Sequence, residues 1–127
     1  MSLSISSSPI LIVEDEAAQR LLFSLMLRDL SYPLLTVADG YRAWTILREQ
    51  LPCLIVLDLL MPEMGGLELL RRIRADSRLR STKILVVTAL VSRLTAEAAV
   101  LADQVLTKPV TKGQLQQAVR ALLGDTC

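Results

Sequence analysis

The amino-acid sequence predicts a doubly wound α/β domain in which five helices cover a five-stranded parallel sheet. Short apolar runs alternate with longer amphipathic stretches, which is typical of repeated strand–helix units. The apolar runs are continuous rather than alternating, so both faces of each strand are expected to be covered by helices. A chain of 127 residues, 52% of them hydrophobic, has enough apolar side chains for one such core.

The first strand is expected over 9–13, an apolar run that ends at three acids. The helix expected over 17–30 carries leucines at the three-to-four spacing of a buried face. The segment 31–33 ends this helix, because proline cannot continue it. The residues expected on its buried face are Leu21, Leu22, Leu25 and Met26.

The second strand is expected over 34–37, and the Asp-Gly turn signal at 39–40 leads into a helix over 41–50. The run over 53–57 is the third strand. A loop with proline and two glycines follows it, and then a helix over 67–75. The apolar positions expected to be buried in that helix are Leu69, Leu70 and Ile73.

The last two strands are expected over 84–87 and 105–107, with a short helix over 95–101 between them. A final helix over 112–123 closes the alternation, with Leu115, Val119 and Leu122 facing inward. Together these elements predict a sheet of the flavodoxin type.

The domain is expected to cover residues 9–124 without an internal boundary. Residues 1–8 are serine-rich, lack the apolar core of a signal peptide and are expected to be a disordered lead-in. Residues 125–127 follow directly on a helical pattern, so we expect that a longer chain could continue there into a linker or a further domain.

Composition excludes several classes of function. The net charge of +1 implies neither nucleic acid nor membrane as a partner, and no run approaches the roughly 20 apolar residues of a membrane span. The arginines between residues 71 and 80 lie beside Glu68 and Asp76 and are interpreted as a solvated face. Histidine is absent, which excludes histidine metal ligands and phosphohistidine on this chain. Two cysteines, Cys53 and Cys127, do not make a disulfide scaffold, so a cytoplasmic location is expected.

Charged residues follow three of the expected strands at the point where each ends. Acids occupy 14–16, Asp58 follows a buried run, and Lys108 follows the last strand. Because the carboxyl ends of parallel strands lie together, we expect these side chains to converge on one rim. That arrangement suits a divalent cation and a phosphoryl group on Asp58. Taken alone, the acids at 14–16 could simply complement the dipole of the helix that follows.

Four segments resemble those of the receiver domains of two-component response regulators, the CheY-like family, and the resemblance covers nearly all of residues 9–123. They are Ile12-Val13-Glu14-Asp15-Glu16, Leu57-Asp58-Leu59-Leu60-Met61-Pro62-Glu63-Met64-Gly65-Gly66, Val87-Thr88-Ala89 and Leu106-Thr107-Lys108-Pro109. The resemblance implies a sheet of strand order 2-1-3-4-5. It also implies a phosphoacceptor switch rather than a turnover enzyme.

The resemblance further implies a role for each residue of the rim. Asp58 would be the phosphoacceptor. Asp15, Asp58 and the backbone carbonyl of Leu60 would bind Mg²⁺, with Mn²⁺ as a substitute, and Glu14 would act less directly. Lys108 would neutralise Asp58 and later a phosphoryl oxygen.

Other residues would complete the site. Thr88 would donate its hydroxyl to the phosphoryl group, small Ala89 would leave room for a donor, and a cis bond before Pro109 would direct the lysine. The implied partners are a sensor histidine kinase or a histidine phosphotransfer protein, and a C-terminal output or kinase domain in a longer chain. The implied oligomeric state is a monomer or a weak homodimer.

The sequence departs from the family pattern in the region of the output surface. Val105 stands where an aromatic switch residue is common, Val110 stands where Phe is frequent, and the stretch from Thr88 to Lys108 is slightly short. Leu60 and Leu90 are large and apolar, and we expect them to shield an aspartyl phosphate from water.

Three alternatives remain. A receiver-like module that docks a partner without phosphorylation is favoured by Val105 and opposed by the intact acids and lysine. An aspartyl-phosphate hydrolase needs a second acid where Leu60 stands. A nucleotide-binding domain needs a glycine-rich loop after the first strand, which this sequence does not have.

Overall fold

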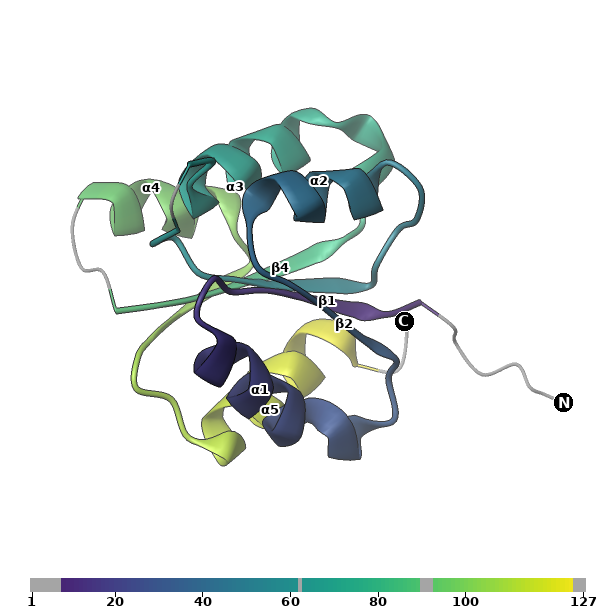
Figure 1. Ribbon diagram of the computed structural model, residues 1–127, viewed down its shortest axis with the longest axis vertical. Helices are drawn as coiled ribbons and strands as arrows, with labels where there is room; N and C mark the ends of the chain where they lie inside the picture. Colours follow the sequence, from purple (N-terminus) through teal and green to yellow (C-terminus); the bar gives the residue numbers. More distant parts are fainter. Residues whose placement is uncertain (1–7, 62, 90–92, 125–127) are drawn as a thin grey trace, which may run out of the picture.

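The computed structural model describes residues 8–61, 63–89 and 93–124. A five-stranded parallel sheet forms its middle layer, in the order β2-β1-β3-β4-β5. Helices α2, α3 and α4 cover one face of the sheet, and α1 and α5 cover the other (Figure 1). The predicted fold class and strand order are therefore confirmed.

The elements alternate along the chain as predicted. The strands are β1 (Ile10–Val13), β2 (Leu34–Val37), β3 (Leu54–Leu57), β4 (Lys83–Thr88) and β5 (Gln104–Thr107). The helices are α1 (Ala17–Leu27), α2 (Gly40–Leu47), α3 (Gly66–Ala75), α4 (Arg93–Leu101) and α5 (Lys112–Leu123), with 3-10 turns at Arg28–Leu30 and Ser77–Leu79.

Two helices end earlier than the sequence predicted. The predicted helix over 17–30 tightens into a 3-10 turn after Leu27 and ends at Ser31, whose φ of 65° is left-handed. The predicted helix over 41–50 ends at Leu47, where the amides of Glu49 and Gln50 both turn to the carbonyl of Ile46. The spacing of apolar residues does not reveal these ends. The last turn of each helix differs from the rest in its hydrogen bonds and not in its apolar pattern.

The strands separate two apolar cores, as continuous apolar runs predict. Leu11 and Val13 of β1 belong to the cluster under α2 and α3, whereas Ile10 and Ile12 belong to the cluster under α1 and α5. This alternation along one strand follows from the two-residue period of β-structure. The sheet is consequently packed on both faces, which suits an edge that has to hold charged groups in place.

The predicted buried face of the first helix is wrong at three of its four positions; only Met26 packs against the core, where it is partly buried. Leu21, Leu22 and Leu25 are 61%, 41% and 44% exposed, and α1 instead buries Phe23 and Leu27. Nearly every position from 21 to 27 is apolar, so more than one stripe satisfied the helical period. The contact between α1 and α5 selected the stripe, and the sequence of α1 alone could not. The predicted core positions of α3 are buried, as are Leu115 and Val119 of α5.

Some expectations concern residues outside the described ranges, namely most of the 1–8 lead-in, the 125–127 end, Leu90 and Cys127. Among the helices that the structure describes, none has the length and apolar character needed to cross a membrane.

Candidate functional site

Two neighbouring strands deliver the first two acids to the same edge of the sheet. Val13 and Leu57, the last residues of β1 and β3, are paired in register. The ladder continues one step further, because the Asp58 amide donates to the Val13 carbonyl at 3.2 Å and the Glu14 amide to the Val37 carbonyl at 3.1 Å. Glu14 and Asp58 therefore emerge side by side from the carboxyl ends of adjacent strands.

Three carboxylates gather at this edge. Oxygen atoms of Glu14, Asp15 and Asp58 all lie within 4.8 Å of one another. Glu14 is 1% exposed and Asp58 is 6% exposed, whereas Asp15 faces the solvent. A set that consists only of carboxylate oxygens, with one open side, fits a hard divalent cation such as Mg²⁺.

Lys108 places a positive charge between two of these acids. Its Nζ donates to Glu14 Oε1 at 2.8 Å and to Asp58 Oδ2 at 3.0 Å. Lys108 follows β5, and its peptide bond to Pro109 is cis, as the resemblance implied. Because all three side chains are largely shielded from water, these contacts are much less screened than surface ion pairs.

Burial and pairing shift the acid–base properties of this cluster. Burial raises the pKa of Glu14, and the Asp58 charge raises it further, although hydrogen bonds from Lys108 and the Glu16 amide partly oppose this. Burial alone would lower the pKa of Lys108, but its hydrogen bonds to Glu14 and Asp58 outweigh burial and hold that pKa above its ordinary value. The ammonium is therefore charged at neutral pH.

The loop after β3 holds the Asp58 side chain from the opposite side. The Leu60 amide donates to Asp58 Oδ1 at 3.1 Å, so both carboxylate oxygens have a donor. Leu60 itself is 49% exposed. Gly66 begins α3 directly against this loop, and a Cβ on it would lie 2.1 Å from the Asp58 carbonyl oxygen. Only glycine permits this approach.

Thr88 and Ala89 lie at the end of β4, as predicted. Thr88 is fully buried, and its carbonyl accepts the Lys108 amide at 2.9 Å, which ties the lysine to the neighbouring strand. Ala89 is exposed at the mouth of a pocket. The strand ends thus bring together all the described residues that the sequence assigned to the rim.

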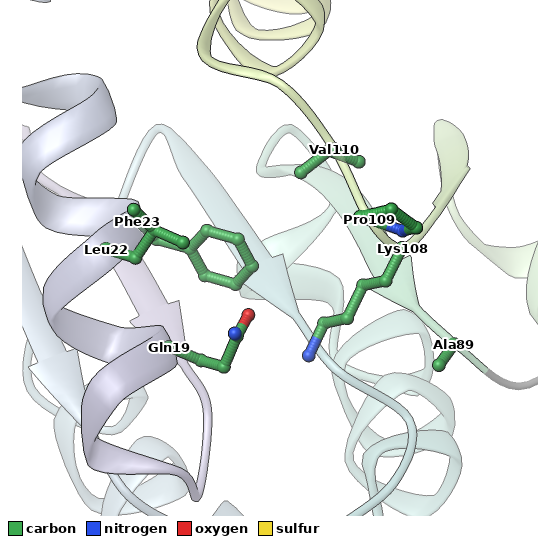
Figure 2. A pocket seen from close by; sticks show the side chains of 7 residues that line it. All are labelled: Gln19, Leu22, Phe23, Ala89, Lys108, Pro109 and Val110. Carbon is green, nitrogen blue, oxygen red and sulfur yellow. The ribbon is translucent and has the colours of Figure 1, made fainter.

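A pocket of about 270 Å³ opens beside the Lys108 ammonium (Figure 2). Its lining consists of Gln19, Leu22, Phe23, Ala89, Lys108, Pro109 and Val110. The Phe23 ring faces the lysine across the pocket, with Nζ 5.7 Å from the ring centroid, which is within reach of a cation–π contact. The ammonium is therefore approached by carboxylates on one side and by an apolar wall on the other.

Sequence reasoning missed the contribution of α1 to this site. Phe23 was not assigned to any role, and neither was Arg20, whose Nη1 donates at 2.9 Å to the carbonyls of both Glu14 and Asp15. The one available signal was that Arg20 is the only charged residue of α1. Gly66 belongs to the segment 57–66 that carries the resemblance, but the sequence does not reveal its packing against the Asp58 loop.

Val105 takes the place of the expected aromatic residue and is half-buried. It pairs with Val86 in register and packs against the core under α2 and α3. Val110 lies at the opposite side, against the core under α1 and α5 and in the wall of the pocket. Neither side chain has the ring that a rotamer switch needs.

Comparisons with known proteins agree with this geometry. The response regulator receiver domain family matches residues 10–120. The chain is 35% identical over 118 residues to the probable chemotaxis protein CheY of Rhizobium etli, covering 91% of this chain and 92% of that protein. It is 30% identical over 124 residues to the probable transcriptional regulator ycf27 of Cyanophora paradoxa, covering 98% of this chain and 52% of that protein. The chain thus spans about half the length of several relatives that it matches.

A solved structure of similar fold carries the metal that the carboxylates fit. The receiver domain of a sensor histidine kinase from Pseudomonas aeruginosa has a magnesium ion coordinated in its active-site cleft. It superposes with a TM-score of 0.84 at 29% identity, over 94% of this chain and 100% of that one. With the family match, the parallel sheet and the acids at its edge, these likenesses show that the chain belongs to the response regulator receiver domains, the phosphorylation-dependent switches of two-component signalling.

Proposed function

We propose that Asp58 is the phosphoacceptor of this receiver domain and that Asp15, Glu14 and Lys108 prepare it for the transfer. The observation that supports this most strongly is the position of the Lys108 ammonium, which contacts both Asp58 Oδ2 and Glu14 Oε1. A lysine that only stabilised the fold would not need two buried acids at the open edge of the sheet.

The charge balance at the site explains why a metal is needed. Three carboxylates and one ammonium leave an excess of negative charge, which repels an incoming phosphoryl group. Asp15 and Asp58, with the Leu60 backbone carbonyl, would hold Mg²⁺ directly, and Glu14 would act less directly. When bound there, Mg²⁺ would supply positive charge to the acids and to the phosphoryl oxygens, and Mn²⁺ would substitute for it.

The transfer itself requires little covalent chemistry from the chain. One carboxylate oxygen of Asp58 forms a bond to phosphorus while the bond from phosphorus to the partner's histidine nitrogen breaks, and that nitrogen keeps the electron pair. Lys108 then pairs with a phosphoryl oxygen instead of the carboxylate, and the Thr88 hydroxyl donates to another. Ala89 leaves the mouth of the pocket open to the donor.

The partners follow from the family. A sensor histidine kinase or a histidine phosphotransfer protein would donate the phosphoryl group in the cytoplasm. Residues 9–124 would act as one module, either alone, as in the Rhizobium etli relative, or joined to an output or kinase domain, as the length of the ycf27 relatives suggests. The module itself would bind no nucleic acid or membrane, and it would be a monomer or a weak homodimer.

The test is to incubate the purified chain with Mg²⁺ and acetyl phosphate and to measure its intact mass. We expect a gain of one phosphoryl group in the native chain, no gain in Asp58→Asn, and no gain when the metal is removed with a chelator. Labelling of the Asp58→Asn variant to the same extent would assign the acceptor to another residue.

A second candidate is a docking module that works without phosphorylation, and Val105 favours it. Without an aromatic side chain at this position, the usual route from the phosphoryl group to the surface of α4, β5 and α5 lacks one component. Binding of Mg²⁺ without any gain in mass would favour this candidate.

A further inference from the structure

The three acids of the site are not held equally well. The carboxylates of Glu14 and Asp58 are buried and accept hydrogen bonds from Lys108, and each also accepts one backbone amide, from Glu16 and Leu60 respectively. Within the described part of the chain, the Asp15 carboxylate accepts no hydrogen bond, and its side chain faces the solvent. Packing and pairing therefore leave this acid free to turn.

The backbone around Asp15 also lies beyond the reach of the sheet. The last ladder bond of β1 involves the Glu14 amide, and Glu16, the residue directly before α1, gives the helix no side-chain cap. Asp15 thus connects the strand to the helix, and the regular hydrogen bonds of neither element fix its backbone. A metal ligand in that position needs some other group to fix the direction of its carboxylate.

Arg20 supplies such a group. Its Nη1 donates to the carbonyl oxygens of Glu14 and Asp15, both at 2.9 Å, so one nitrogen joins the two peptide groups that flank the Asp15 Cα. Arg20 itself is anchored in α1, where its amide bonds to the Glu16 carbonyl at 2.9 Å and its carbonyl accepts the Ser24 hydroxyl at 2.9 Å. Its side chain is half-buried.

We infer that Arg20 is a positioning residue for the metal site, because it holds the backbone that aims the Asp15 carboxylate at the cation. This inference rests on the proposed metal site and adds to it a residue that does not touch the ion. Groups that orient metal ligands in this way are commonly worth about 10-fold to 100-fold in metal affinity.

Electrostatics provides a clear test of the inference, because the two effects of Arg20 have opposite signs. Arg20 forms no ion pair with a carboxylate in the described residues, so its positive charge stands near the site and repels a divalent cation. Removing this charge alone would strengthen Mg²⁺ binding. Removing a group that positions Asp15 would weaken it.

The experiment measures the Mg²⁺ dissociation constant by isothermal titration calorimetry for the native chain, Arg20→Gln and Arg20→Lys. We expect Arg20→Gln to bind Mg²⁺ about 10-fold more weakly and Arg20→Lys to recover part of the affinity, because an ammonium donates to carbonyls with less defined geometry. Arg28→Gln, which removes the same charge from an exposed position just after α1, should leave the constant nearly unchanged.

Circular dichroism of the metal-free variants verifies that each is folded before the titration. If Arg20→Gln does not fold, the Mg²⁺ affinity of Arg20→Lys is compared with that of the native chain instead. Unchanged or tighter binding in folded Arg20→Gln would overturn the positioning role while leaving the proposed function intact. Absence of Mg²⁺ binding in the native chain would overturn both. Equal loss in Arg20→Gln and Arg28→Gln would show that the loss does not depend on the contacts of Arg20 with the Glu14 and Asp15 carbonyls, and it would likewise overturn the inference.

Discussion

Lys108 Nζ donates a hydrogen bond of 3.0 Å to Asp58 Oδ2, although 50 residues separate the two in sequence. The contact forms because β3 and β5 flank β4 and all three strands end at the same edge of the sheet. It brings a largely shielded ammonium to the acid that is proposed to accept phosphate. The stability and the chemistry of this edge are therefore linked.

Replacing Lys108 by Gln should destabilise the metal-free protein. Two buried carboxylates would then face each other without a cation, and breaking a buried pair of this kind costs about 3 kcal/mol. Added Mg²⁺ should restore a large part of the loss, because it neutralises the same acids. Urea unfolding with and without Mg²⁺ measures both effects, and Lys112→Gln, at an exposed ion pair, should change stability by well under 1 kcal/mol.

Gly66→Ala should damage both stability and phosphorylation. Its Cβ would lie 2.1 Å from the Asp58 carbonyl oxygen and 2.6 Å from the Leu59 Cα, so the Asp58 loop would have to move. We expect a loss of about 2 kcal/mol or more, with slower labelling by acetyl phosphate. Gly65→Ala is the matched control, because its nearest contacts are at 3.9 Å. A Gly66→Ala variant with native labelling would show that the approach of α3 does not shape the site.

Glu14→Gln should alter how stability depends on pH. Because the pKa of Glu14 is raised in the folded protein, the fold binds more protons than the unfolded chain between the ordinary value of 4.5 and the raised value. The ionised carboxylate thus lowers stability as pH rises through that window. We expect metal-free Glu14→Gln to be more stable than the native chain at neutral pH and to lose this advantage at low pH.

Thermal unfolding across a pH series measures this difference, with Glu16→Gln as the exposed control. The native chain should also lose affinity for Mg²⁺ on acidification. This loss should begin at a higher pH than it would if the pKa of Glu14 had its ordinary value. A stability difference that does not change with pH would show that Glu14 is not responsible.

Val105→Ala should lower the stability of the fold without changing phosphorylation, because we expect Val105 to act through packing. Val105 is half-buried against the core under α2 and α3, so truncation should cost about 1 kcal/mol. Val100 is 83% exposed, and Val100→Ala should cost almost nothing. Both variants should accept phosphate from acetyl phosphate at the native rate. Slower labelling in Val105→Ala alone would indicate that the valine takes part in the switch after all.

Leu60→Asn should shorten the lifetime of phosphorylated Asp58, and adding Leu90→Glu, at a position outside the described residues, should shorten it further. The Leu60 amide donates a hydrogen bond to the Asp58 carboxylate, so the residue lies beside it. The half-exposed Leu60 side chain is apolar and shields the carboxylate on the side that is open to water. A polar side chain there would admit and orient a water molecule. Decay of the labelled mass with time measures the lifetime, and an unchanged decay rate in the double variant would contradict the shielding role.

The order of the elements and the residues at the rim could be predicted from the amino-acid pattern alone. Continuous apolar runs specify strands with two covered faces, and an acid or lysine directly after such a run must lie at the carboxyl edge. Glu14, Asp58 and Lys108 could therefore be placed together from their positions after these runs. Val105 and Val110 could be recognised as departures because their positions are counted from Lys108.

The buried face of α1 and the contribution of that helix to the site could not be predicted, because they depend on how the elements pack together. Local periodicity was satisfied by several stripes of apolar residues, and the choice depended on how α1 meets α5. The same packing brings Phe23 to the wall of the pocket and lets Arg20 reach the carbonyls of Glu14 and Asp15. Contacts of this kind depend on the position of one element relative to another, which the period of a single segment does not encode.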